Sequence, residues 1–252
     1  MLASYQNQYN GVGLFHEVFG HPRNVVPQTN IFSEDMTTVN FRISLIDEEV
    51  KEFIQAVNTN DVIEAVDGIC DTLYVVNGAY HVLGASYPTS AITSFVDSDS
   101  VYTPNVLEVK ATKIKSKIGL LLSMLDCLRS TSINHDYDGF VQTLHLIQIE
   151  CYNLASTLGV NVDSCFNEVQ SSNMSKVCTS EQEAIESVEW YRNTEKRYTD
   201  PQFRKSTNPQ YWVIYDNTTS KILKSINFRK PDLQSVIDNT SNHSNQVVQK
   251  ID

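Results

Sequence analysis

The sequence predicts an all-α fold, a bundle of long amphipathic helices with a small C-terminal β-hairpin. Three observations support this fold class. Apolar residues recur at helical spacing over several long stretches, glycines stand where these stretches end, and only one short segment has the pattern of paired strands. The chain has 252 residues, of which 41% are hydrophobic, enough for one large or two small domains.

The first three helices are predicted from their apolar spacing and their end signals. Residues 8–22 indicate a short helix that Gly20 and Pro22 bring to an end. Between residues 39 and 57, apolar side chains follow a helical stripe. A short turn with Asp61 as N-cap then begins a helix that ends at Gly84.

The rest of the chain alternates loops and helices before the hairpin. After a predicted loop over 86–104, we expect helices at 105–129 and 138–158, and a shorter helix that Asp163 caps. Two β-rich runs around an Asn/Thr/Ser turn predict a hairpin over 211–225. Residues 239–252 are rich in Asn, Ser and Gln and are expected to form a disordered tail.

Composition excludes several classes of protein. No run of 18 apolar residues exists, so no membrane span is expected, and the first residues lack the features of a signal peptide. The five cysteines are scattered without a CxxC pair, which favours reduced thiols and a cytoplasmic location. The net charge of −11 argues against a nucleic-acid partner.

The charges are distributed unevenly along the chain. Residues 1–100 hold thirteen acids and three basic residues, whereas the other sixteen Lys and Arg follow residue 100. An acidic half and a half that supplies cations can complement each other in one site. Simple scatter of surface charge is an equally good interpretation of this observation alone.

Carboxylates gather on two consecutive predicted helices. Glu64, Asp67 and Asp71 fall within about 60° of one another on a helix of 100° per residue. Glu52 shares a face of the preceding helix with both Glu48 and Glu49. Because antiparallel helices joined by a short turn face each other, the two acidic stripes are expected to meet.

Such a cluster is costly unless something compensates it. Two unit charges about 4 Å apart repel by roughly 4 kcal/mol at an effective dielectric constant near 20. No Lys or Arg lies between Val62 and Leu83, and an all-oxygen ligand set prefers Mg²⁺ or Mn²⁺. A di-iron site would need Glu-x-x-His pairs, which are missing. The alternative is a solvated acidic face, which fits residues 47–52 better than the apolar second helix.

These residues resemble the ExxE…ExxD signature of the all-α nucleoside triphosphate pyrophosphohydrolases, the MazG-type superfamily. The resemblance covers about half of the chain, and it is closest to the branch similar to phosphoribosyl-ATP pyrophosphohydrolases and related to dimeric dUTPases. It is carried by five blocks in order: FHEVFGHP (15–22), RISLIDEEVKEF (42–53), DGICDTLYVVNGA (67–79), LGVNVDSCFNEVQSSNMSK (158–176) and SKILKSINFRKPDL (220–233).

The resemblance implies a Mg²⁺-dependent enzyme that cleaves a nucleoside triphosphate to a monophosphate and pyrophosphate. By motif, the metal ligands are Glu49, Glu52, Glu64 and Asp67. Glu48 is either a further ligand or the base that activates water, so Glu48 and Glu49 are the candidate catalytic residues. The candidates for substrate binding are Asp71, Asn173, Lys176, Lys224 and Arg229. His16, Tyr74 and Phe228 fit either packing or contact with the base.

The domain organisation expected from the resemblance is one MazG-like domain over residues 1–238, with insertions at about 85–150 and 178–210. The resemblance implies a homodimer, unless the inserted helices complete the bundle within one chain. Two other functions stay open: the phosphoribosyl-ATP pyrophosphohydrolase step of histidine biosynthesis, and a non-catalytic regulator that binds nucleotide or metal.

Overall fold

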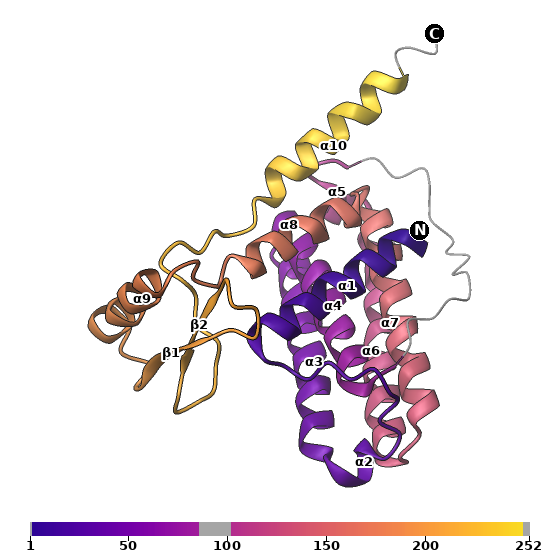
Figure 1. Ribbon diagram of the computed structural model, residues 1–252. Helices are drawn as coiled ribbons and strands as arrows, with labels where there is room; N and C mark the ends of the chain where they lie inside the picture. The colour runs from indigo at the N-terminus through magenta and orange to yellow at the C-terminus, as the bar shows by residue number, and fades with distance from the viewer. Residues whose placement is uncertain (1, 86–101, 249–252) are drawn as a thin grey trace.

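The computed structural model describes residues 2–85 and 102–248 and confirms the all-α class (Figure 1). The elements in chain order are α1 (Leu2–Phe19), α2 (Ile31–Glu34), α3 (Met36–Asn58), α4 (Val62–Leu83), α5 (Val106–Val109), α6 (Ala111–Ile133), α7 (Tyr137–Leu158), α8 (Val162–Met174), α9 (Glu181–Thr194), β1 (Pro201–Lys205), β2 (Trp212–Asp216) and α10 (Leu233–Val248).

Four long helices form the body of the molecule. Helix α3 packs on α4, α4 on α7, α7 on α6, and α6 back on α3 (Figure 1). Helices α1 and α8 cover the other side of α4 and pack against each other. One hydrophobic core runs through all six helices. Helices α6 and α7, which lie mostly within the first predicted insertion, therefore close a bundle with α3 and α4 within one chain, while the insertion itself and a homodimer stay predictions.

Helix α4 lies at the centre of this arrangement, and both of its ends match the sequence prediction. The side chain of Asp61 accepts a hydrogen bond from the Glu64 backbone N–H at 3.1 Å. Gly84 ends the helix with a φ of 60°, and a Cβ there would lie 1.9 Å from the carbonyl oxygen of Val26. Only glycine fits this position, because the left-handed backbone and the close carbonyl both exclude a side chain.

Helices α3 and α4 approach each other closely at Gly68. A Cβ on this residue would lie 2.9 Å from both Cα and Cβ of Phe53, which is 1% exposed. The missing side chain lets the two backbones meet directly. Because Glu52 precedes Phe53 and Asp67 precedes Gly68, the same contact brings the two acidic stripes together.

Helix α8 begins two residues earlier than a cap at Asp163 would allow. Asn161 is the N-cap, and its side chain accepts a hydrogen bond from the Ser164 N–H at 3.0 Å. Asp163 instead accepts hydrogen bonds from Gln8 of α1 and Tyr152 of α7. The prediction of Asp163 as cap is therefore wrong, because tertiary partners recruit its carboxylate.

A smaller unit of α9, β1 and β2 packs beside the bundle on the left of Figure 1. The two strands are antiparallel, with Phe203 opposite Ile214. Its own small core includes Val188, Ile214 and Leu223. This unit occupies most of the second predicted insertion.

The predicted hairpin over 211–225 is present only in part. Strand β2 pairs with the upstream strand β1, and after the turn the chain returns with a single bridge between Tyr215 and Ile222. Beyond this bridge, the backbone N–H of Lys224 donates to the Tyr191 hydroxyl instead of a strand. The chain after Ile222 therefore does not continue as a second hairpin strand, because Tyr191 of α9 accepts the hydrogen bond of its backbone.

The remaining differences concern element lengths. Helix α1 is longer than the predicted helix over 8–22, and the predicted helix over 105–129 divides into α5 and α6. Most of the loop predicted over 86–104 lies outside the described residues. The structure continues α10 to Val248, where the sequence predicts a disordered tail from residue 239. Asp232 accepts hydrogen bonds from Ser235, and Leu233 and Ile237 are buried, so the first turns of α10 are held in place. Once these turns have formed, each further residue joins the helix at little cost in free energy.

Across the described part of the chain, no helix has the length and apolar character required to span a membrane.

Two glycines in helices test the close approach of α3 and α4. We expect Gly68→Ala to lower the free energy of unfolding by about 1–3 kcal/mol, because the new Cβ forces the backbones apart. The matched control is Gly119→Ala in α6, where nothing lies within 4 Å, and it should stabilise by about 0.5–1 kcal/mol. Urea unfolding of the two variants measures both changes. Equal changes of the same sign would contradict the account.

Candidate functional site

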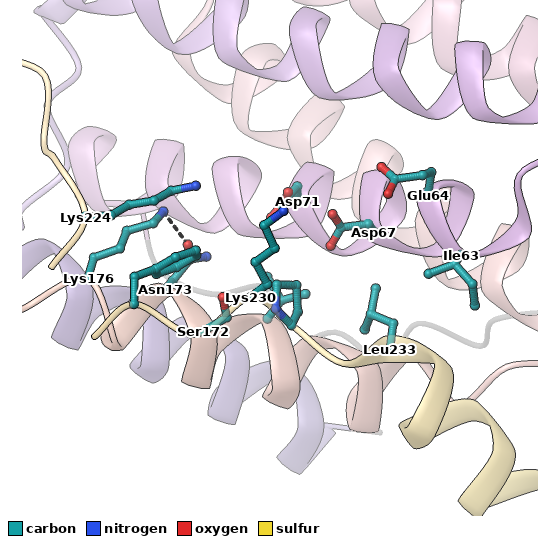
Figure 2. Close-up of a pocket in the computed structure, with 13 residues that line it drawn as sticks. Ile63, Glu64, Asp67, Asp71, Ser172, Asn173, Lys176, Lys224, Lys230 and Leu233 are labelled. Atoms are coloured by element: carbon teal, nitrogen blue, oxygen red, sulfur yellow. Dashed lines mark hydrogen bonds between the residues drawn. The ribbon is translucent and has the colours of Figure 1, made fainter. Parts of the chain in front are cut away.

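A pocket of about 330 Å³ lies between α4, α8 and the segment that leads into α10 (Figure 2). Carboxylates of α4 line one side and amines from later in the chain line the other. The lining residues are Ile63, Glu64, Asp67, Asp71, Val169, Ser172, Asn173, Lys176, Lys224, Phe228, Lys230, Pro231 and Leu233.

The acidic side of the pocket is the predicted stripe on α4. Glu64, Asp67 and Asp71 follow one another along the helix and face the pocket (Figure 2). Their neighbours on the same helix are nearly all buried, from Ala65 to Leu83. The stripe is therefore the polar edge of a helix that otherwise belongs to the core.

Two of these carboxyl groups have strongly raised pKa values. Burial raises the pKa of Asp67 to about 6, and repulsion from Glu64 and Glu52 adds to this. Burial and the charge of Asp67 raise the pKa of Asp71 to about 7, although Lys176 opposes the shift. The Oδ1 atom of Asp67 is buried and has no hydrogen-bond partner among the described residues. The negative charge on this wall is only partly compensated within the protein.

The acids of α3 do not line the pocket. Glu49 is partly buried, and burial followed by the charges of Asp71, Glu52, Glu48 and Asp67 raises its pKa to about 8. Glu48 and Glu52 are exposed. The acids of α3 and α4 therefore interact electrostatically, as the sequence predicts.

Asp47 is separate from this group. It accepts hydrogen bonds from Lys51 at 2.6 Å and from Arg129 of α6 at 2.9 Å. Lys51, the lysine within the acidic segment of α3, therefore binds Asp47 and not the acids that face α4.

The donor set fits a hard divalent cation. All the ligands proposed from the motif are carboxylates, and Asp67 offers a buried oxygen without a partner. In the chain as described, however, no three Asp, Glu, His or Cys side chains converge as a ready-made metal site. The chemistry of the residues supports Mg²⁺ or Mn²⁺, and the individual ligands stay a prediction.

The opposite wall of the pocket is cationic. Lys176 donates to Asn173 Oδ1 at 2.5 Å, which Figure 2 shows, and both residues lie at the end of α8 or just after it. Burial lowers the pKa of Lys176, while Asp71 partly offsets this. Burial and the neighbouring charges of Lys230 and Lys221 likewise lower the pKa of Lys224. Amines are crowded here, so an added anion would be favourable.

Apolar side chains complete the pocket. Ile63 and Leu233 lie at the end away from Lys176 and Lys224 (Figure 2), and Val169 also contributes to the lining. The ammonium group of Lys224 lies 4.4 Å from the ring centre of Phe228, a cation–π contact. The amines of Lys176 and Lys224 therefore lie at one end of the pocket, and apolar side chains lie with Glu64 at the other (Figure 2).

Most of the predicted substrate-binding residues meet in this pocket, but Arg229 does not. Asp71, Asn173, Lys176 and Lys224 all line it. Arg229 forms an ion pair with Glu168 and donates to Ser171, so the structure places it outside the pocket. Lys230, the next residue, lines the pocket in its place.

Sequence reasoning missed Lys230, Ser172 and the apolar lining residues. The sequence did contain a signal for Lys230. Arg229 and Lys230 are adjacent basic residues, and successive side chains of an extended chain point to opposite sides, so only one of the two can face the pocket. His16 is 3% exposed and hydrogen-bonded to the Pro22 carbonyl, which confirms its packing role. Tyr74 is 8% exposed and packs between Phe15 and Phe166.

Comparison with known proteins gives two matches. The family model for phosphoribosyl-ATP pyrophosphohydrolase matches residues 12–90, which include both acidic stripes. An uncharacterized protein of Acanthamoeba polyphaga mimivirus is 33% identical over 240 residues, covering 91% of this chain and 95% of the viral protein. No solved structure matches the chain. The family match supports a nucleotide pyrophosphohydrolase-like activity.

Removal of one charge tests the repulsion within the acidic wall. We expect Asp67→Asn to be at least as stable as the parent in a chelator at neutral pH, because it removes a buried charge near Glu64 and Glu52. Thermal unfolding in EDTA measures this, with Glu189→Gln on the exposed face of α9 as control for net charge. A loss of roughly 1–3 kcal/mol would instead mean that Asp67 accepts structural hydrogen bonds.

Proposed function

Because the chain belongs to the phosphoribosyl-ATP pyrophosphohydrolase family, within the MazG-like superfamily, we propose that it is a metal-dependent nucleoside triphosphate pyrophosphohydrolase. The reaction is cleavage between the α and β phosphates, which gives a nucleoside monophosphate and pyrophosphate. The substrate class, the metal and the site residues are all part of the proposal.

The observation that carries the proposal is the pair of opposed walls in one pocket. The carboxylates of α4 line one side of a cavity of about 330 Å³, and Lys176, Lys224 and Lys230 line the other. A cation beside the acids and a polyphosphate beside the amines would compensate both charged walls together. Neutral ligands would compensate neither wall.

The basic wall is proposed to hold the phosphates. Lys176, Lys224 and Lys230 supply charge-assisted hydrogen bonds to phosphate oxygens. Asn173, already bonded to Lys176, orients that ammonium group and offers its amide N–H groups to the substrate. At the other end, Ile63 and Leu233 provide an apolar surface that suits the nucleoside (Figure 2).

The acids of α3 and α4 together are proposed to hold Mg²⁺ or Mn²⁺: Glu64 and Asp67 from the acidic wall of the pocket, and Glu49 and Glu52 from the neighbouring helix α3. A cation bound there would neutralise charge on the phosphate oxygens and activate a water molecule. Glu49 is one of these proposed ligands, so Glu48, the exposed acid that precedes it, is proposed either as a further ligand or as the base that activates water. Asp71, which lines the pocket beside Lys176, orients that amine or a substrate group.

Hydrolysis of phosphoribosyl-ATP is the second candidate, since this is the activity that the matching family model describes. It uses the same bond and the same two walls. A pyrophosphate-release assay over the nucleoside triphosphates, the deoxynucleoside triphosphates and phosphoribosyl-ATP separates the two candidates. A non-catalytic regulator would bind a nucleotide in this panel and release no pyrophosphate from any.

The bond that is cleaved gives the sharpest test of the reaction class. We expect a monophosphate and pyrophosphate as the first products, with one of them labelled when hydrolysis runs in ¹⁸O-water. Phosphorus NMR and mass spectrometry identify the products. Asp67→Asn should lower kcat by about a hundredfold or more while the Glu189→Gln control keeps parental activity. Initial release of orthophosphate and a diphosphate would place the enzyme in another reaction class.

A further inference from the structure

Two of the three pocket lysines belong to a segment without regular secondary structure. We call residues 221–232 the strap, because they run from the bridge at Ile222 to the start of α10 along one side of the pocket. The strap carries Lys224 and Lys230. No helix or strand ladder within the strap orients these side chains, so their direction depends on what holds the backbone.

Helix α9 holds the first half of the strap. Glu183 is 8% exposed and accepts hydrogen bonds from the Ser225 hydroxyl and from the Thr179 N–H and hydroxyl, the latter two at 2.8 and 2.9 Å. On the same helix, Tyr191 Oη accepts from the Lys224 N–H at 3.0 Å. Ser187 Oγ accepts from the backbone N–H of Ile226 at 3.1 Å. Three consecutive residues of the strap are therefore bound to α9.

Helix α8 holds the second half of the strap. Glu168 forms an ion pair with Arg229 and accepts a hydrogen bond from the Asp232 N–H at 3.0 Å. Arg229 also donates to Ser171 Oγ at 2.8 Å, and its backbone N–H donates to Ser175 Oγ at 3.0 Å. These contacts account for the orientation of Arg229 away from the pocket.

The two attachments share one pattern. Glu183 holds Ser225, which follows Lys224, and Glu168 holds Arg229, which precedes Lys230. Burial alone would raise the pKa of each glutamate, but the hydrogen bonds that each accepts hold its pKa below the usual value. Both glutamates are thus ionised at neutral pH, and a charged acceptor binds its donors more strongly than a neutral one.

We propose that Glu183 and Glu168 are positioning residues for the phosphate-binding lysines Lys224 and Lys230. Helix α9, which lies outside the residues that the family model matches, then serves substrate binding and is not a peripheral decoration. The inference rests on the proposed function, because it needs a phosphate chain in the pocket. Neither glutamate touches the substrate; each acts through the neighbouring lysine.

The test measures binding and catalysis in the full-length chain. The probe is a nonhydrolysable nucleoside triphosphate with a bridging carbon between the α and β phosphates, titrated by calorimetry with Mg²⁺ present. Glu183→Gln should weaken binding roughly tenfold and raise KM similarly, with kcat within about twofold of the parent. Glu189→Gln, an exposed acid on the same helix, should change neither.

A double-mutant cycle shows whether Glu183 acts through Lys224. In the Lys224→Ala background, Glu183→Gln should have no further effect on binding, since the lysine it positions is gone. Glu168→Gln should behave in the same way with Lys230→Ala. Equal weakening in both backgrounds, or unchanged binding in the parent background, would overturn the proposal.

A variant on the other side of the contact guards against misfolding. If Glu183→Gln does not fold, Ser225→Ala removes the same bond from the strap, together with the one that Ser225 accepts from the Asn227 N–H, while Glu183 keeps its bonds to Thr179. Its expected effect on binding is the same. If the parent chain neither binds the probe nor hydrolyses any nucleotide, the proposed function itself is wrong. If the parent binds the probe and the variants bind it equally well, only the positioning role is wrong.

Discussion

The direct contact of two helix backbones at Gly68 and Phe53 is the constraint on which the rest of the site depends. It places α3 and α4 closer than any side chain on Gly68 would allow. The turn between Asn58 and Val62 makes the helices antiparallel, so the acids beside this contact come from both helices and face the same region. The fold thereby concentrates negative charge on partly buried groups, and burial together with this mutual repulsion raises the pKa values of Glu49, Asp67 and Asp71.

The opposing charge comes from more than a hundred residues further along the chain. Lys176 follows α8, and Lys224 and Lys230 lie in the strap, which both α8 and α9 hold in place. The helices in and beside the two predicted insertions therefore have different contacts in this structure. Helices α6 and α7 close the bundle around α3 and α4, and α9 supports the strap over the pocket. The catalytic proposal draws its acids from the part that matches the family model and its cations from outside that part.

Local patterns predicted much of this structure. The apolar stripes predicted the long helices, and Asp61 and Gly84 predicted the two ends of α4. The rotation of 100° per residue in a helix predicted that the acids of α4 share one face. These features depend on residues close in sequence, where helix geometry alone decides which side chains share a face.

Features set by distant partners could not be predicted in this way. Asp163 was expected to cap α8, but Gln8 and Tyr152 hold its carboxylate, and Asn161 caps the helix instead. Arg229 and Lys230 are chemically similar neighbours, and the contacts of Arg229 with Glu168 and Ser171 of α8 decide which one turns away from the pocket. The second strand of the hairpin gives way for the same reason, because Tyr191 competes for its backbone.

The most direct test of the central claim is a crystal structure of the full chain with Mn²⁺ and a nonhydrolysable nucleoside triphosphate, with Mn²⁺ located by its anomalous scattering. The account predicts a manganese peak bonded to carboxylate oxygens from both α3 and α4, with the phosphates between this peak and Lys176, Lys224 and Lys230. A nucleotide bound elsewhere, or a peak with ligands from only one of the two helices, would contradict it.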